Sequence, residues 1–139
     1  MNINELCKDA YERSKASGWH ENSPKPGDPE YVRYETTRHM LVVTEIAEAT
    51  EALRNKWPEV CVDRDDGGGM LGVEPSMLLL QDAVRVPHNK PEGEAVELAD
   101  ALIRICDIAG SRGWDMEAII QAKLNYNATR GHRHGGKAV

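Results

Sequence analysis

The segment from Ala95 to Ala109 is apolar in almost every direction around a helix. At about 100° per residue, its charged side chains fall into a single stripe about 80° wide. The stripe consists of Glu97, Asp100, Arg104 and Asp107. A helix that is hydrophobic nearly all round is buried, so we expect this stripe to face a cleft or a slot of solvent. Within it, Arg104 is expected to be a structural partner of Asp100 or Asp107 rather than a phosphate ligand.

A second apolar segment, Met40–Leu53, carries another pair of acids, Glu45 and Glu48. Residues three apart share one side of a helix, where like charges repel, and the burial of an unpaired charge is unfavourable. A divalent cation would remove both problems. Glu45 and Glu48, together with Glu97 and Asp100, therefore form a candidate metal site. Either pair alone is more often a solvated helix face.

The composition of this acidic set favours a hard cation. Mg²⁺ and Mn²⁺ prefer oxygen ligands, and no His or Cys is interleaved with the four acids, which argues against zinc and copper. Neither pair contains the Glu-x-x-His motif of a di-iron bundle. We therefore expect Mg²⁺, with Mn²⁺ as an alternative. Four carboxylates can hold one or two such ions, which also bridge substrate phosphates.

The rest of the chain predicts an all-α fold. Helices are expected over residues 3–17, 30–56, 94–111 and 115–130. Asn4 and Asp115 are candidate N-caps for the first and last of these. Residues 57–93 give a weaker signal, in which 76–84 is interpreted as a short helix rather than a strand. We expect a single domain, residues 1–139, folded as a bundle of four or five helices with an insertion between the two acid-bearing helices.

The last predicted helix carries a candidate substrate-binding face. Lys123, Asn127 and Arg130 recur at i, i+4 and i+7, and cations flanking an amide suit phosphate oxygens and a base or sugar edge. The alternative is a solvated helix end with favourable cations near its C-terminus. Lys137, in the tail 132–139, could also fold back onto phosphates, although disorder is the default for such a tail.

Charge and composition exclude several classes of function. The net charge of −6 is poorly suited to non-specific duplex binding, so no nucleic-acid partner is expected. The N-terminal segment lacks the basic stretch and apolar run typical of a signal peptide, and there is no run of 18 apolar residues, so no membrane partner is expected. Three widely spaced cysteines form neither a zinc motif nor a disulfide framework, and Cys106 is expected to be a small core residue. A cytoplasmic protein is predicted.

The ordered motifs resemble those of a known family. Glu45-Ile-Ala-Glu48 and the downstream Glu97-Leu-Ala-Asp100 match the ExxE…ExxD signature of MazG-like nucleotide pyrophosphohydrolases, in the all-α NTP pyrophosphatase superfamily. The resemblance covers roughly residues 30–56 and 88–137. Three further segments carry it: Lys90–Gly93, Lys123–Arg130 and His134–Lys137. Residues 57–88 match no part of the pattern.

This resemblance implies a helical homodimer or homotetramer. It also implies Mg²⁺-dependent cleavage of an NTP or dNTP between the α and β phosphates, which gives the nucleoside monophosphate and pyrophosphate. The implied catalytic metal ligands are Glu45, Glu48, Glu97 and Asp100, and the implied substrate-side residues are Lys123, Asn127 and Arg130. Two alternatives stay open: a non-catalytic nucleotide or metal sensor, and a helical interaction protein whose acids are solvated.

Overall fold

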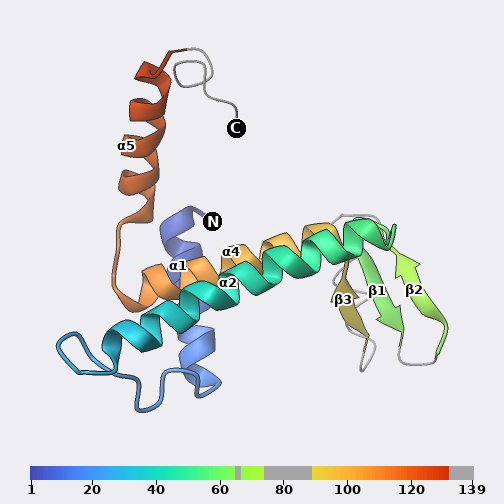
Figure 1. Ribbon diagram of the computed structural model, residues 1–139, viewed down its shortest axis with the longest axis horizontal. Coiled ribbons are helices and arrows are strands. Elements are labelled where there is room, and N and C mark those ends of the chain that lie inside the picture. The colour runs from blue at the N-terminus through green and yellow to red at the C-terminus, as the bar shows by residue number, and fades with distance from the viewer. Residues whose placement is uncertain (65–66, 74–88, 132–139) are drawn as a thin grey trace. The chain divides into compact units, whose positions relative to one another are not determined.

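The computed structural model describes residues 1–64, 67–73 and 89–131 (Figure 1). The elements in chain order are α1 (Ile3–Ala16), α2 (Tyr31–Arg54), β1 (Cys61–Arg64), β2 (Gly69–Gly72), β3 (Lys90–Glu92), α4 (Glu94–Ser111) and α5 (Met116–Thr129). The chain divides into two compact units. The first unit is Met1–Glu21 with Cys106–Val139, and the second unit is Asn22–Ile105.

The N-termini of α1 and α5 are capped by polar side chains in the first unit. Asn2 forms a capping box with Glu5, so the prediction that Asn4 caps α1 is wrong by two residues. Asn4 instead donates to Asp115 Oδ1 over 2.9 Å and accepts from the Glu117 backbone N–H over 3.1 Å. The prediction that Asp115 caps α5 is confirmed, because its carboxylate accepts from a backbone N–H of the first turn.

Small buried side chains bring α1 close to the end of α4. Cys7 and Ala10 of α1 form one core cluster with Cys106 and Ala109 of α4. A Cβ on Gly110 would lie 2.2 Å from the Cys7 carbonyl oxygen, so only glycine permits this approach. Cys106 is 1% exposed, which confirms it as a small core residue, and burial followed by the Cys7 thiol raises its pKa to about 12.

The second unit contains a small antiparallel sheet with strand order β2-β1-β3. The prediction of an all-α fold is therefore wrong, although the described residues do contain four helices. β1 pairs with β2 from Cys61↔Gly72 to Arg64↔Gly69, and with β3 from Cys61↔Glu92 to Asp63↔Lys90. Each strand has only three or four residues, which is too short to give a clear period-2 pattern.

The sheet is joined directly to the start of α4. Gly93 has φ +110°, and a Cβ there would lie 2.6 Å from the carbonyl oxygens of Pro58 and Glu59. The Ala95 backbone N–H also donates to the Glu59 carbonyl over 3.0 Å. These contacts fix the first turn of α4 against the chain that leads into β1, and so they position the acid-bearing turns that follow.

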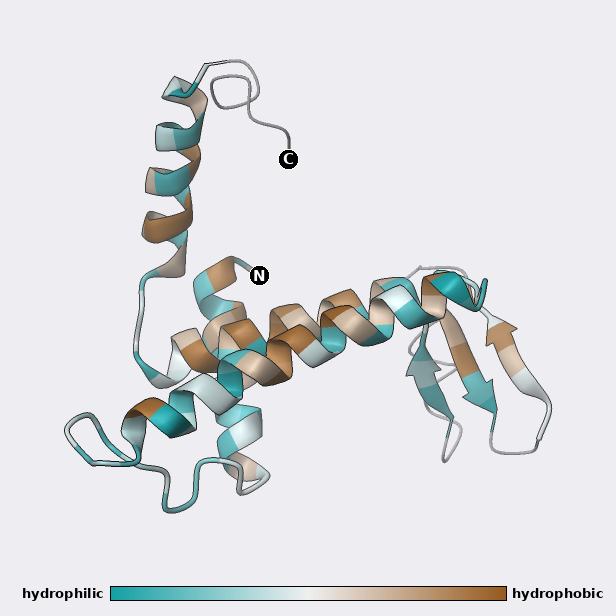
Figure 2. Ribbon diagram, viewed as in Figure 1, coloured by the Kyte–Doolittle hydropathy of each residue, from teal (hydrophilic) through white to brown (hydrophobic). Residues whose placement is uncertain are grey.

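The helix boundaries agree closely with the sequence prediction. The helix expected over 94–111 is α4, and the helix expected over 30–56 is α2, shorter by one residue at its start and two at its end. Apolar residues recur along both helices (Figure 2). The helix predicted over 76–84 lies outside the described residues. Among the helices of the described parts, none is both long enough and apolar enough to cross a membrane.

Candidate metal and phosphate site

Three of the four predicted ligands meet between α2 and α4 in the second unit. Glu45, Glu48 and Glu97 each offer a carboxylate oxygen, and these three atoms lie within 4.8 Å of one another. We call these three residues the glutamate cluster. Glu45 is 7% exposed and Glu97 4% exposed, whereas Glu48 is exposed. The i, i+3 spacing of the first pair puts both side chains on the side of α2 that meets Glu97.

Asp100 lies one helical turn beyond Glu97 and is exposed. The structure does not include it among the three acids whose oxygens approach within 4.8 Å. It is nevertheless electrostatically linked to them, because desolvation and then the charge of Glu45 raise its pKa, while Arg104 and Lys90 oppose that rise.

A fifth carboxylate, from Glu92 on β3, adjoins the glutamate cluster. The pKa of Glu97 is raised to about 7, first by burial and then by the hydrogen bond that protonated Glu97 donates to Glu92 and by the charges of Glu92 and Glu48. At Glu92 burial also raises the pKa, but the hydrogen bond to Glu97 and the pairing with Lys90 outweigh it, so its pKa falls below the ordinary value. Two hydrogen-bonded carboxyl groups require a shared proton, which resides mainly on Glu97.

Glu92 and Lys90 were recognised in the sequence only as part of a family motif, without a role. Lys90 Nζ lies 2.5 Å from Glu92 Oε1. Both residues reach the cluster because β3 pairs with β1, about 30 residues earlier in the chain. No local periodicity signals such a pairing. The one available signal was the position of Glu92 just before the Gly93 that opens α4.

Arg104 pairs with a different acid from the two that were expected. Its Nε donates to Glu45 Oε1 over 2.6 Å, so the guanidinium bridges from α4 to α2. The predicted pairing with Asp100 or Asp107 is therefore wrong. Asp107 instead lies 2.7 Å from His20 Nε2 within the first unit.

Two of the predicted substrate-binding residues, Lys123 and Asn127, lie on α5 in the first unit. Lys123 Nζ lies 5.0 Å from the centre of the Tyr126 ring, and Asn127 is half-buried. Arg130 is the C-cap residue and has extended backbone angles, so the predicted helical face ends at Asn127. Lys137 lies outside the described residues.

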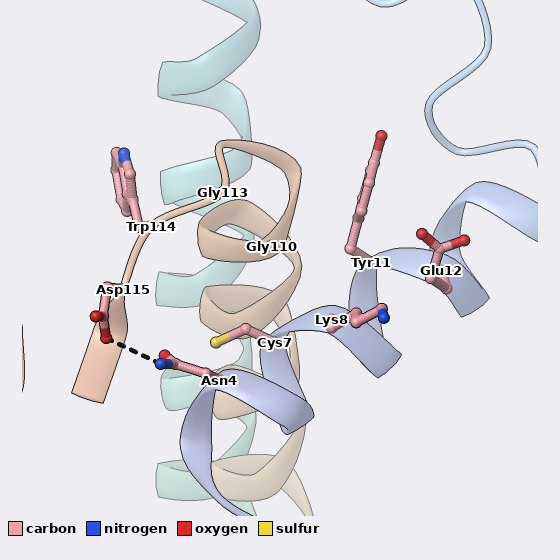
Figure 3. Close-up of a pocket in the computed structure, with 9 residues that line it drawn as sticks. All are labelled: Asn4, Cys7, Lys8, Tyr11, Glu12, Gly110, Gly113, Trp114 and Asp115. Atoms are coloured by element: carbon pink, nitrogen blue, oxygen red, sulfur yellow. Dashed lines mark hydrogen bonds between the residues drawn. The ribbon is translucent and has the colours of Figure 1, made fainter. Parts of the chain in front are cut away.

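The first unit also contains a pocket of about 470 Å³ between α1 and the turn that leads into α5 (Figure 3). Its lining residues are Asn4, Cys7, Lys8, Tyr11, Glu12, Gly110, Gly113, Trp114 and Asp115. The hydrogen bond between Asn4 and Asp115 crosses one side of it. Among the described residues, none of those predicted to bind metal or substrate lines this pocket.

Comparison with known proteins finds no matching family model, no matching curated protein and no matching solved structure. The resemblance to MazG-like pyrophosphohydrolases therefore stays a prediction from the motifs. The geometry of the glutamate cluster is independent of that resemblance, and it carries the functional argument below.

Proposed function

We propose that this protein is a Mg²⁺-dependent nucleoside triphosphate pyrophosphohydrolase. It would cleave an NTP or dNTP between the α and β phosphates and release the monophosphate and pyrophosphate. One observation carries the proposal: Glu45, Glu48 and Glu97 converge from two helices to within 4.8 Å, although two of them are buried. Buried acids at this separation repel one another unless positive charge is supplied.

The donor set fits a hard divalent cation. All three groups are carboxylates, as Mg²⁺ and Mn²⁺ prefer, and Asp100 lies one helical turn beyond Glu97 on α4. A cation would supply the positive charge that the proton on Glu97 and the guanidinium of Arg104 supply in the metal-free protein. When bound, Mg²⁺ neutralises phosphate charge and polarises a phosphoryl oxygen as a Lewis acid.

The residues around the cluster suit phosphoryl transfer. This chemistry depends on positioning and electrostatic stabilisation rather than on covalent help from the protein. Glu48 is the exposed member of the cluster, so it is the acid best placed to accept a proton from an attacking water. Lys123, Asn127, Arg130 and Lys137 are proposed as substrate contacts on the strength of the motif resemblance and, for the first two, their spacing on α5.

We also propose that the protein assembles as a homodimer or homotetramer. The support is apolar surface on the two acid-bearing helices. Val43 of α2 is 54% exposed, and Leu98 and Leu102 of α4 are each 45% exposed. Contiguous exposed apolar surface commonly marks a protein interface. Light scattering after size-exclusion chromatography tests this, and a monomer at all concentrations would contradict it.

The test of activity is a panel of NTPs and dNTPs, assayed for pyrophosphate and for orthophosphate with Mg²⁺ or with EDTA. We expect pyrophosphate release that requires Mg²⁺. Glu48→Gln should abolish turnover, whereas Glu51→Gln, an exposed acid three residues further along α2, should retain it. If well-folded protein releases no pyrophosphate from any member of the panel, the proposal is wrong. Nucleotide-dependent thermal stabilisation without turnover would then indicate the sensor alternative.

A further inference from the structure

Arg104 is held in a way that leaves most of its guanidinium available. Its Nε donates to Glu45 Oε1 over 2.6 Å, and within residues 1–64, 67–73 and 89–131 its two Nη groups have no other partner. The Glu45 side chain is 9% exposed, while the Arg104 side chain is 43% exposed. The pair thus has a buried anionic end and a solvent-facing cationic end.

A second ion pair, on α2, differs from this one in its exposure. Arg38 lies 3.1 Å from Glu35, and the two side chains are only 11% and 9% exposed. Both ends of that pair are buried, and the Arg38 guanidinium also lies 5.6 Å from the centre of the Tyr34 ring. The greater exposure of Arg104 is not needed for neutralising Glu45. It is what a guanidinium requires if it is to reach a ligand in solution.

Lys90 supplies a second exposed cation beside the same acids. Its Nζ lies 2.5 Å from Glu92 Oε1, while its side chain is 68% exposed. The hydrogen bond to Glu92 raises the pKa of Lys90, and the charges of Glu97 and Glu48 contribute to that rise. The ammonium group therefore stays protonated at the edge of the glutamate cluster.

The two cations lie at opposite ends of the acids along α4. Lys90 precedes the helix, while Arg104 is seven residues beyond Glu97, which is about 10 Å at 1.5 Å per residue. The carboxylates of Glu97 and Asp100 occupy the turns between them. A polyphosphate chain matches this order of charges, because its central oxygens share a cation with carboxylates and its outer oxygens accept charge-assisted hydrogen bonds.

We propose that Arg104 and Lys90 bind the phosphate oxygens of a polyphosphate chain bound at the glutamate cluster. This inference rests on the proposed function and adds two phosphate-binding residues to it. Arg104 offers paired Nη donors that match phosphate geometry, whereas Lys90 acts as a point charge. Both belong to the same unit as the metal ligands. Neither is among the residues for which the sequence predicted a substrate contact.

The experiment measures binding of inorganic tripolyphosphate with Mg²⁺ by calorimetry, a probe that does not depend on base or sugar. Arg104→Met and Lys90→Met should each weaken binding at least about tenfold, since each removes a charge-assisted contact. Arg104→Lys should lose affinity as well, because it keeps the charge but not the paired donors. The matched control is Arg54→Met, which removes one exposed positive charge at the end of α2 and should leave binding unchanged.

Mg²⁺ binding without phosphate separates this role from a structural one. Because Arg104 occupies an oxygen of Glu45, its removal should leave Mg²⁺ affinity unchanged or raise it, whereas a residue that only orients Glu45 would lower it when removed. A parallel loss of Mg²⁺ and tripolyphosphate binding in Arg104→Met would overturn the inference. So would the absence of tripolyphosphate binding by the wild-type protein.

NTP turnover tests the proposed function, and tripolyphosphate binding tests the present inference, so the two can fail independently. If tripolyphosphate binding depends on Arg104 and Lys90 but no pyrophosphate is released from any NTP, the polyphosphate site stands and hydrolysis is refuted. If NTPs are hydrolysed and Arg104→Met keeps the wild-type KM and tripolyphosphate affinity, hydrolysis stands and this inference fails.

Discussion

In the metal-free protein, a rise from about pH 5.5 to about pH 8.5 should destabilise the fold through Glu97. Its pKa is raised from 4.5 to about 7 by burial, by the hydrogen bond and charge of Glu92, and by the charge of Glu48. Between these two pKa values the native state binds a proton that the unfolded chain has released. The free energy of unfolding therefore falls as the pH rises through this window.

The size of the effect follows from the shift. Each pKa unit corresponds to about 1.4 kcal/mol, so the full displacement of the Glu97 pKa corresponds to about 3 kcal/mol. About 2 kcal/mol of this is lost between pH 5.5 and 8.5, and the remainder is lost below pH 5.5, where the carboxyl of the unfolded chain titrates. Glu92 has a lowered pKa, so its titration lies at or below the ordinary value and outside this window.

The assay is urea unfolding in EDTA across this pH range, with Glu97→Gln as the reference. The glutamine side chain is neutral at every pH and can still donate to Glu92. The stability of the variant relative to the wild-type protein should rise by about 2 kcal/mol from pH 5.5 to pH 8.5, because only the wild-type protein loses a native-state proton in this range. Because all other groups titrate in both proteins, the difference isolates Glu97. A difference that stays constant from pH 5.5 to 8.5 would refute the reasoning.

Further predictions concern metal, backbone and capping. Mg²⁺ at a hundred times its Kd should stabilise the protein by about 2.7 kcal/mol in thermal unfolding, and Glu45→Gln should lose most of this; an unchanged response in that variant would remove Glu45 from the site. Gly93→Ala should cost at least about 2 kcal/mol in urea unfolding, since it combines a positive φ with a Cβ 2.6 Å from two carbonyl oxygens. Gly27→Ala has the positive φ but no atom within 4 Å of the new Cβ, so an equal cost in both variants would contradict the steric part of the argument. Asn4→Ala should cost about 1 kcal/mol, because it removes two hydrogen bonds to the start of α5; a neutral result would show that Asp115 caps this helix without help.

Features set by neighbouring residues were predicted well from the sequence. The limits of α4 follow from the apolar period and from Pro91 and Gly93 before it, and Asp115 was identified as a cap because capping acts over three residues. The meeting of Glu45, Glu48 and Glu97 was anticipated because two i, i+3 pairs define two narrow stripes, which helix packing can bring together.

Features that depend on distant pairing were missed. β1 has two fully buried residues at its start and only four residues in all, so no alternation distinguishes it from a loop. Glu92 reaches Glu97 only because β3 adds to that strand. Arg104 was assigned to acids on its own helix, where i±3 and i±4 neighbours were available. Its actual partner, Glu45, is 59 residues away. Sequence spacing cannot rank these choices, because it carries no information on the distance between helices.

The three buried thiols allow local opening of the protein to be measured by thiol alkylation. Cys7 and Cys106 belong to the first unit, Cys61 belongs to the second, and all three are buried and free. Burial raises the pKa of Cys61, and that of Cys106 reaches about 12, so little thiolate is available to an alkylating reagent while the protein is folded. Each cysteine therefore reacts only after the structure around it opens locally. The alkylation rates of Cys61 and Cys106 therefore compare how often the second unit and the first unit open locally, and no probe has to be introduced.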